Sequence, residues 1–240
     1  MGLLSKLFNH DSPPKAQGGN AQRNNITCAG YSVKGKNPAT GRVKRVYVLV
    51  ESTAPLEEVQ KKSGLLPPYE IEGDGLPAYN GPTEKQLAYA KDIGVSFPAD
   101  ATASDASVFL TRYEEGRPLY APPASDRIVR LLIDRGIDLP AYAGAYEASN
   151  LYLHNIGLEE RIAFFAMRVY CSLYKKQYRL LEDAPQSERE RFYKCAQKYQ
   201  GDSAFVRSVF CYTGADLPLD SCPAPKKLMA YDMVADFFKE

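Results

Sequence analysis

An internal repeat is the feature that most constrains the fold of this chain. Residues 83–111 align without a gap on residues 125–153, and eight of the 29 aligned positions are identical. A third, partial copy begins at Ser203 and extends over residues 203–239. Repetition at a fixed spacing indicates one small structural unit that is used more than once. The identical pairs are Asp92 and Asp134, Gly94 and Gly136, Pro98 and Pro140, Ala99 and Ala141, Ala101 and Ala143, Ala103 and Ala145, Ala106 and Ala148, and Ser107 and Ser149.

Each copy predicts a helix, an extended plug and a second helix. A Ser or Thr before the first helix can accept a hydrogen bond from an unpaired N–H group. A glycine follows that helix, where the left-handed conformation suits it, and a proline then prevents a return to helix. The predicted caps are Thr83, Ser125 and Ser203, with Thr83 and Gln86 forming a capping box. The predicted joints are Gly94 with Pro98, Gly136 with Pro140, and Gly214 with Pro218, and the apolar plugs are Phe97, Leu139 and Leu217.

The segment between the second and third copies predicts two more helices. Residues 158–182 contain no helix breaker and carry two apolar stripes, so we expect one long central helix there. Residues 187–202 predict a further helix that turns Phe192 and Cys195 inward. Residues 82–240 are therefore interpreted as one mainly α-helical domain of about eight helices.

The first third of the chain predicts a tail and a small mixed module. Residues 1–26 are rich in Pro, Gly, Asn and Gln beyond residue 8, which is typical of a flexible linker. Alternating apolar residues on either side of a turn that opens at Asn37 and closes at Gly41 predict two strands. A short amphipathic helix and a brief strand follow, so residues 27–73 predict a β-β-α-β module. The fold class expected for the whole chain is α+β.

The residue types needed for common catalytic chemistry are scarce. The only histidines are His10, in the linker, and His154, which we expect to cap carbonyl groups at a helix end. Five cysteines show no Cys-x-x-Cys spacing, and the phosphate-binding loop, the dinucleotide fingerprint and the nucleophile elbow are all missing from the sequence. We therefore predict no enzyme activity, no metal site and no cofactor.

Cysteine usage and hydropathy bear on the compartment. An odd set of unpaired cysteines without a signal peptide favours reduced thiols in the cytoplasm. No apolar run approaches the roughly 20 residues that a membrane-spanning helix needs. Residues 1–8 place leucines on one helical face, so any membrane contact is expected to be limited to that segment.

A basic hairpin is the clearest electrostatic feature. Residues 1–50 hold eight Lys or Arg and a single acid, Asp11, for a local charge of +7. The hairpin tip predicts backbone N–H groups facing a phosphate, and its two tyrosines could stack on bases. A lysine-protected sheet edge explains the same pattern without a ligand. The candidate nucleic-acid-binding residues are Lys34, Lys36, Arg42, Lys44, Arg45, Tyr31 and Tyr47.

The repeated unit resembles, in outline, the SAP-type helix-extended-helix modules of DNA-associated proteins. The stretch "PTEKQLAYAKDIGV" is also similar to a segment that recurs in uncharacterised bacterial proteins. The resemblance covers about 30 residues of each copy, and it implies a helical scaffold without an active site. This chain departs from DNA-binding versions because acids make the copies acidic to neutral: Asp92, Asp100, Asp105, Asp134, Asp138 and Glu147.

These observations predict a non-catalytic, cytoplasmic binding or adapter protein. The expected partner is a protein that contacts the helical domain through tyrosine-rich surfaces. The alternative is a nucleic-acid-associated accessory protein that uses the hairpin of residues 31–47. An enzyme of a class that the motifs do not reveal is the third hypothesis.

Overall fold

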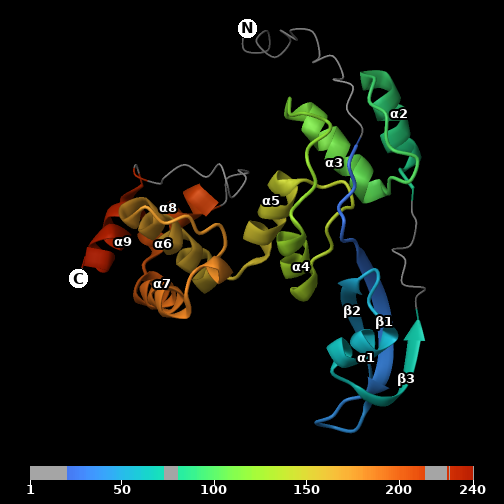
Figure 1. The fold of residues 1–240 in the computed structure, drawn as a ribbon, viewed down its shortest axis with the longest axis horizontal. Helices are drawn as coiled ribbons and strands as arrows, with labels where there is room; N and C mark the ends of the chain where they lie inside the picture. Colours follow the sequence, from blue (N-terminus) through green and yellow to red (C-terminus); the bar gives the residue numbers. More distant parts are fainter. Residues whose placement is uncertain (1–20, 73–80, 214–225, 227, 240) are drawn as a thin grey trace, which may run out of the picture. The chain divides into compact units, whose positions relative to one another are not determined.

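The computed structural model describes residues 21–72, 81–213, 226 and 228–239 (Figure 1). An antiparallel sheet at the N-terminal end is followed by a mainly helical region, which confirms the α+β class. The chain forms two compact units. One comprises Met1–Pro123 and Pro140–Gly144, and the other comprises Ala124–Leu139 and Ala145–Glu240. The joint and the plug predicted for the third copy, Gly214 with Pro218 and Leu217, lie outside the described residues.

The β-β-α-β module is present as predicted. It consists of β1 (Cys28–Lys36), β2 (Val43–Glu51), α1 (Leu56–Ser63) and β3 (Leu66–Glu72). The strands are antiparallel in the order β2-β1-β3, so β2 and β3 are the two edges. Gly41, at the end of the β1–β2 turn, has a φ of 66°, which fits the conformation predicted for it.

One face of the sheet packs against α1. Side chains alternate between the two faces of a strand, so Tyr31 and Val33 of β1 lie on this side together with Val48 and Val50 of β2. The hydrophobic core of the module is formed by Ala29, Tyr31, Val33, Val48, Val50, Val59 and Leu65. Because this cluster is buried against α1, the opposite face of the sheet is the one that can meet solvent or a partner.

The first two copies of the repeat fold alike. The first copy forms α2 (Glu84–Ile93) and α3 (Ala103–Glu114), and the second forms α4 (Asp126–Asp134) and α5 (Ala145–Asn155). At a shift of 42 the helices of the two copies begin at equivalent residues and end within one residue of each other. The predicted helix, plug and helix are confirmed for both copies.

The joints of the two copies also share their backbone geometry. Gly94 and Gly136 each have a φ of 72°, as the left-handed position after a helix requires. Two backbone hydrogen bonds recur at equivalent places in both joints. In the first copy, the N–H of Val95 donates to the carbonyl of Ala90 (2.8 Å) and the N–H of Ala101 to that of Pro98 (3.0 Å). In the second copy, the N–H of Ile137 donates to the carbonyl of Leu132 (2.9 Å) and the N–H of Ala143 to that of Pro140 (3.0 Å).

Helix capping follows the prediction in one copy of three. Thr83 and Gln86 form the expected capping box. Ser125 occupies the cap position of α4 but makes no side-chain cap bond. The prediction for Ser203 is wrong, because Oδ1 of Asp202 accepts the N–H groups of the first turn of α8 (Ser203–Thr213). Aspartate is a strong competitor for this role, since its carboxylate also suits the positive helix end.

The central helix is shorter than predicted. α6 (Leu158–Tyr174) ends where Lys175 takes a left-handed conformation with a φ of 53°. Three polar residues follow Tyr174 and offer no apolar side chain to bury, so the helix stops and Tyr178 falls in the loop. α6 is nevertheless central, because α7 (Gln186–Tyr199), α8 and α9 (Met229–Lys239) all pack against it.

Two further expectations concern burial. Phe192 and Cys195 of α7 are fully buried, as predicted. The predicted linker extends too far, because Asn24 is buried at 4% exposure and its N–H bonds to the carbonyl of Ala141 at 2.7 Å. Within the described part of the chain, every helix is too short or too polar to cross a membrane.

Candidate binding surface on the three-stranded sheet

The face of the sheet opposite α1 carries two cross-strand rows of side chains, which we call the open face. Ser32 of β1 lies between Tyr47 of β2 and Glu72 of β3. The second row places Lys34 between Arg45 and Glu70. Cross-strand neighbours on one face are close enough to interact directly. The hairpin residues predicted from the sequence are thus brought together with two carboxylates that were not predicted.

Ion pairs with β3 neutralise the centre of the open face. Nζ of Lys34 donates to both carboxylate oxygens of Glu70, at 3.0 and 2.8 Å. Nη1 and Nη2 of Arg45 donate to Oε2 and Oε1 of Glu72, and Nη1 also donates to the hydroxyl of Ser32 at 3.4 Å. The bond to Glu72 raises the pKa of Arg45, and the same contact lowers the pKa of Glu72. Both cations are therefore already matched by carboxylates.

Tyr47 is the exposed aromatic residue of the open face. Its side chain is 73% exposed and lies against Gly30 of the neighbouring strand. A Cβ at Gly30 would stand 1.7 Å from the Tyr47 hydroxyl oxygen, so the ring fits there only because residue 30 is glycine. Tyr31 points to the other face and is 7% exposed inside the core, so its predicted role as a stacking residue is wrong.

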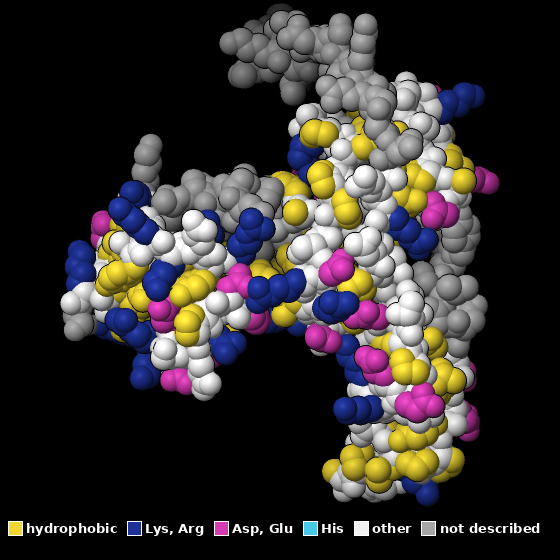
Figure 2. Space-filling view, in the orientation of Figure 1, with side chains coloured by type: hydrophobic (Ala, Val, Ile, Leu, Met, Phe, Trp, Pro, Cys, Tyr) yellow, Lys and Arg dark blue, Asp and Glu magenta, His cyan; other side chains and the backbone are white. Residues whose placement is uncertain are grey.

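Apolar side chains extend the open face toward the turn. Val43 and Leu66 flank Lys36 on either side in the register of the sheet, and they are 64% and 50% exposed. Figure 2 shows hydrophobic side chains gathered around the end of the module where the β1–β2 turn lies. Exposed apolar side chains next to charged pairs are typical of protein-binding surfaces.

The hairpin tip does not offer its backbone N–H groups to an anion. Oδ1 of Asn37 accepts hydrogen bonds from the N–H groups of Ala39 and Thr40 at 2.9 and 3.3 Å. The backbone carbonyl of Asn37 accepts a third bond, from the N–H of Gly41, at 2.8 Å. Asparagine commonly closes a turn in this way. The predicted phosphate cradle at the tip is therefore wrong.

Three of the predicted cations stay at the rim of the surface. Lys36, Arg42 and Lys44 are exposed and have no ion pair with any residue that the structure describes. Lys36 and Arg42 lie on the turn side of the module, and Lys44 lies on the β2 edge, where the register places it on the α1 side of the sheet. The net positive charge of the hairpin is therefore carried by its rim and not by the centre of the open face.

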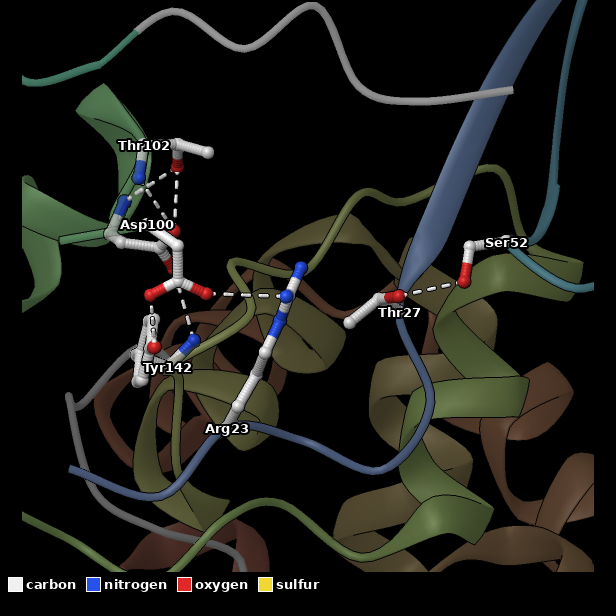
Figure 3. Close-up of polar contacts among 7 residues, drawn as sticks. Arg23, Thr27, Ser52, Asp100, Thr102 and Tyr142 are labelled. Carbon is white, nitrogen blue, oxygen red and sulfur yellow. Dashed lines mark hydrogen bonds and ion pairs between the residues drawn. The ribbon is translucent and has the colours of Figure 1, made fainter. Parts of the chain in front are cut away.

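A second polar cluster, shown in Figure 3, links the first two copies of the repeat. The hydroxyl of Tyr142 donates to Oδ1 of Asp100 at 2.5 Å, and Arg23 donates to Oδ2 of Asp100 at 3.3 Å. Burial, reinforced by Asp100, raises the pKa of Tyr142 to about 12. The hydroxyl of Tyr142 must keep its proton to donate this hydrogen bond to Asp100.

The deepest carboxylate of that cluster is fully committed to backbone and cap bonds. Asp105 is 1% exposed, and its Oδ2 accepts the N–H and hydroxyl of Thr102 at 3.0 and 2.7 Å. Its Oδ1 accepts the N–H of Tyr142 at 3.0 Å. Asp105 thus completes the capping box of α3, in which Thr102 is the N-cap residue, and it also accepts the N–H of Tyr142, so its buried oxygens have hydrogen-bond partners.

The remaining candidate residues are His154 and the side chains that could bind a metal ion. His154 bonds through Nδ1 to the carbonyl of Asn150 at 2.7 Å, as expected for a histidine at a helix end. Among the described residues, no three His, Cys, Asp or Glu side chains come together in a way that could hold a metal ion.

A scan against protein-family models, a search of curated proteins and a search of solved structures each returned no match.

Proposed function

We propose that this chain is a non-catalytic binding protein whose partner is another protein. The observation that carries the proposal is the exposure of Val43, Tyr47 and Leu66 on one open sheet face whose central charges are paired. Rigid aromatic and aliphatic side chains surrounded by satisfied polar groups are what protein interfaces use as anchors. We also propose a cytoplasmic location, supported by the free thiols of Cys28, Cys171 and Cys195.

The charge distribution favours a protein over a nucleic acid. A phosphate backbone would have to displace Glu70 from Lys34 and Glu72 from Arg45 before it could use either cation. It would then lie beside two unpaired carboxylates, which repel it. Nucleic-acid affinity comes mainly from phosphate contacts, so a surface that is neutral at its centre gives up most of that affinity.

The edges of the sheet suggest the form that the partner takes. β3 begins with Leu66, Pro67 and Pro68, and proline has no N–H group to give to a neighbouring strand. β2 has no proline over its nine residues and is the other edge of the sheet. An extended partner segment can add to such an edge by main-chain hydrogen bonds. Arg42 and Lys44 beside β2 favour a segment with acidic side chains.

The helical domain is the less suitable contact surface. Its tyrosines were expected to face a partner, but Tyr142, Tyr152, Tyr170 and Tyr212 are buried. Their rings pack against phenylalanines of the core, as with Tyr170 and Phe192 at 5.3 Å between ring centres. These four tyrosines therefore serve internal packing, whereas Tyr89 and Tyr174 are 40% and 45% exposed.

A charge-swap experiment with short strand-forming peptides tests the proposal. The probe is a fluorescent ten-residue peptide in which Glu alternates with Val, compared with the same peptide carrying Lys in place of Glu. We expect the acidic peptide to bind the full chain, Lys44→Glu to weaken it about tenfold, and the lysine peptide to regain affinity for that variant. Lys85→Glu, an equal charge change on the exposed side of α2, is the matched control.

Two results would contradict the proposal. One is equal binding of both peptides by the native chain and by Lys44→Glu. The other is tight binding of a single-stranded oligonucleotide that is lost on Lys44→Glu while neither peptide binds. The second result would support the nucleic-acid-associated function instead.

A further inference from the structure

The backbone groups of β2 point alternately to the two sides of the strand, and this alternation decides what the free edge can bind. In an antiparallel pair, every second residue exchanges both backbone hydrogen bonds with the residue opposite, and the residues between them direct their groups away. β1 and β2 pair along their whole length, which places Cys28 opposite Glu51 and Lys36 opposite Val43. Because β1 is the only neighbour of β2 among the described strands, every second residue of β2 directs its backbone groups outward.

Two hydrogen bonds just beyond the ends of the strands show which residues face outward. The N–H of Asn37 donates to the carbonyl of Arg42 at 2.9 Å, and the N–H of Ser52 donates to the carbonyl of Thr27 at 2.8 Å. Both pairs continue the register of the two strands. Counting inward from either pair gives the same result: the even-numbered residues of β2 bond to β1, and the odd-numbered residues direct their N–H and C=O groups to the edge.

The outward backbone groups are accessible over the first half of β2. Within the described part of the chain, the backbone groups of Val43, Arg45 and Tyr47 form no hydrogen bond. The side chains of these residues are exposed, as is that of Lys44 between them. Leu49 is the next outward residue and is only 4% exposed, so the accessible edge ends at Tyr47.

A strand added to this edge would meet different side chains on its two faces. On the open face it would lie beside Val43 and Tyr47, which are 64% and 73% exposed, and beside Arg45, which is paired with Glu72. Apolar partner residues fit that side. On the α1 side it would meet Lys44, which has no ion pair with a described residue. An antiparallel partner residue opposite Lys44 would belong to a pair without backbone bonds, in which the Cα atoms are only about 4.5 Å apart, so an acidic residue there could contact the ammonium group directly.

The charge of β2 disfavours a second copy of this chain as the added strand. β2 carries Lys44 and Arg45, with Arg42 immediately before it, and contains no acidic residue before Glu51. Antiparallel pairing of two such edges would place the cations of one copy beside those of the other. Like charges on facing strands destabilise the pair. An acidic segment of another protein avoids this repulsion.

We infer that the β2 edge binds an antiparallel segment of another protein in which apolar and acidic residues alternate. Its apolar residues form backbone hydrogen bonds opposite Val43, Arg45 and Tyr47, and one of its acidic residues lies opposite Lys44. The inference rests on the proposed function and adds the direction, the register and the face of each kind of side chain. In this arrangement the N–H groups of the apolar residues point to β2, and those of the acidic residues point away from it.

Backbone N-methylation of the peptide in which Glu alternates with Val tests this arrangement, because it removes N–H groups without changing a side chain. Three fluorescent forms are titrated with the full chain by anisotropy: unmodified, N-methylated at every valine, and N-methylated at every glutamate. We expect methylation at valine to weaken binding at least about tenfold, because it removes the bonds to β2. Methylation at glutamate should leave the affinity within about threefold, and it controls for the stiffer methylated backbone.

Proline at Val43 tests the same hydrogen bonds from the side of the protein. Val43 is the first residue of an edge strand and its N–H points outward, which is a position where proline is tolerated. We expect Val43→Pro to bind the unmodified peptide about fivefold more weakly than Val43→Ala, which controls for the lost side chain. Circular dichroism should show that both variants are folded.

The outcomes separate this inference from the function on which it rests. If the unmodified peptide binds but methylation at glutamate weakens binding as much as methylation at valine, the arrangement is overturned and the binding function stands. Equal affinity of Val43→Pro and Val43→Ala overturns it in the same way. If the unmodified peptide does not bind, both proposals fail. A dimer in solution that Val43→Pro dissociates also overturns the inference, because a second copy would then occupy the edge.

Discussion

Tyr142 and Asp100 occupy equivalent positions in the two copies of the repeat, and the hydroxyl of Tyr142 donates a hydrogen bond to the Asp100 carboxylate at 2.5 Å. The plug of the second copy therefore packs against the plug of the first. Because one member of the pair is a tyrosine and the other an aspartate, the two copies have become complementary and are no longer interchangeable. The contact depends on both residues having diverged.

Removing the hydroxyl of Tyr142 tests this contact. Tyr142→Phe keeps the ring in its cluster but loses the bond to Asp100, so we expect the free energy of unfolding to fall by about 1 kcal/mol at neutral pH. Urea denaturation measures the change. Tyr120→Phe is the control, because its ring lies in the same cluster and its hydroxyl has no hydrogen bond with a described residue. A similar loss in both variants would contradict the assignment.

The same pair predicts a pH dependence. The pKa of Tyr142 is raised from 10.0 to about 12 in the folded chain, chiefly by burial and then by its bond to Asp100. A raised folded pKa stabilises the fold below the unfolded pKa, and this stabilisation is lost as pH rises through the folded pKa. The difference in stability between the native chain and Tyr142→Phe should therefore shrink between pH 10 and pH 12. A difference that stays constant over that interval would show that folding does not raise the pKa of the Tyr142 hydroxyl.

The buried carboxylate of Asp105 should contribute more to stability. Asp105→Ala removes the N3 side chain of the α3 capping box and leaves the N–H groups of Thr102 and Tyr142 without their acceptor, so we expect a loss of about 3 kcal/mol. Asp105→Asn keeps one acceptor oxygen and should lose less. Thermal unfolding of both variants measures the order, and Asp92→Ala, an exposed acid on α2, should change stability by less than about 0.5 kcal/mol. An Asp105→Asn variant as stable as the native chain would show that the negative charge is not needed.

The glycine joints predict a purely backbone cost. No atom lies within 4 Å of a Cβ placed on Gly136, so Gly136→Ala meets no steric obstacle. Its φ of 72° still disfavours any residue with a Cβ, by about 1 kcal/mol. Gly94→Ala should lose the same amount, and Gly201→Ala, where φ lies outside the left-handed region, should lose almost nothing. An equal loss of stability at Gly201 would show that the left-handed conformation is not the cause, because lower flexibility of the unfolded chain would instead stabilise all three variants.

Gly30 and Tyr47 should behave as one functional unit. Gly30→Ala places a methyl group where the Tyr47 hydroxyl lies, and the exposed ring can move away at small cost in stability. We expect acidic-peptide binding to fall as far as it does in Tyr47→Ala, with the loss of stability below about 1 kcal/mol. Gly35→Ala is the contrast, because its Cβ would stand 2.9 Å from the backbone oxygen of Leu66. That variant should lose more stability, since backbone is harder to move than a surface ring.

Local patterns predicted most of the fold. Alternating residues such as Val46, Val48 and Val50 define the sheet, because period two matches a strand. The repeat identified four helices and two left-handed glycines, because helix termination depends on a few residues next to each other. The end of α6 and the burial of Asn24 were missed. Asn24 forms hydrogen bonds with the carbonyl groups of Pro140 and Ala141, and Pro140 is 116 residues away along the chain. No local sequence pattern predicts a contact between residues so far apart.

The binding surface was predicted only in part, for a related reason. The cations of the hairpin are adjacent in the sequence, so their clustering was evident. Their neutralisation depends on β3, where Glu70 and Glu72 alternate with Ile71 in "YEIEG". That alternation was the available signal, because it places both acids on one strand face. Which cation each acid meets depends on the strand order β2-β1-β3, and the sequence pattern did not determine it.

The division of the second copy between the compact units has a practical consequence for dissecting this protein. The chain passes from one unit to the other after Pro123, after Leu139 and after Gly144. A single cut at any of these points leaves one fragment without a segment that its core uses. A fragment of residues 1–123 lacks Pro140–Gly144, and a fragment of residues 145–240 lacks Ala124–Leu139, so we expect both to fold incompletely. Residues 1–144 and residues 124–240, in contrast, each keep every segment of one unit.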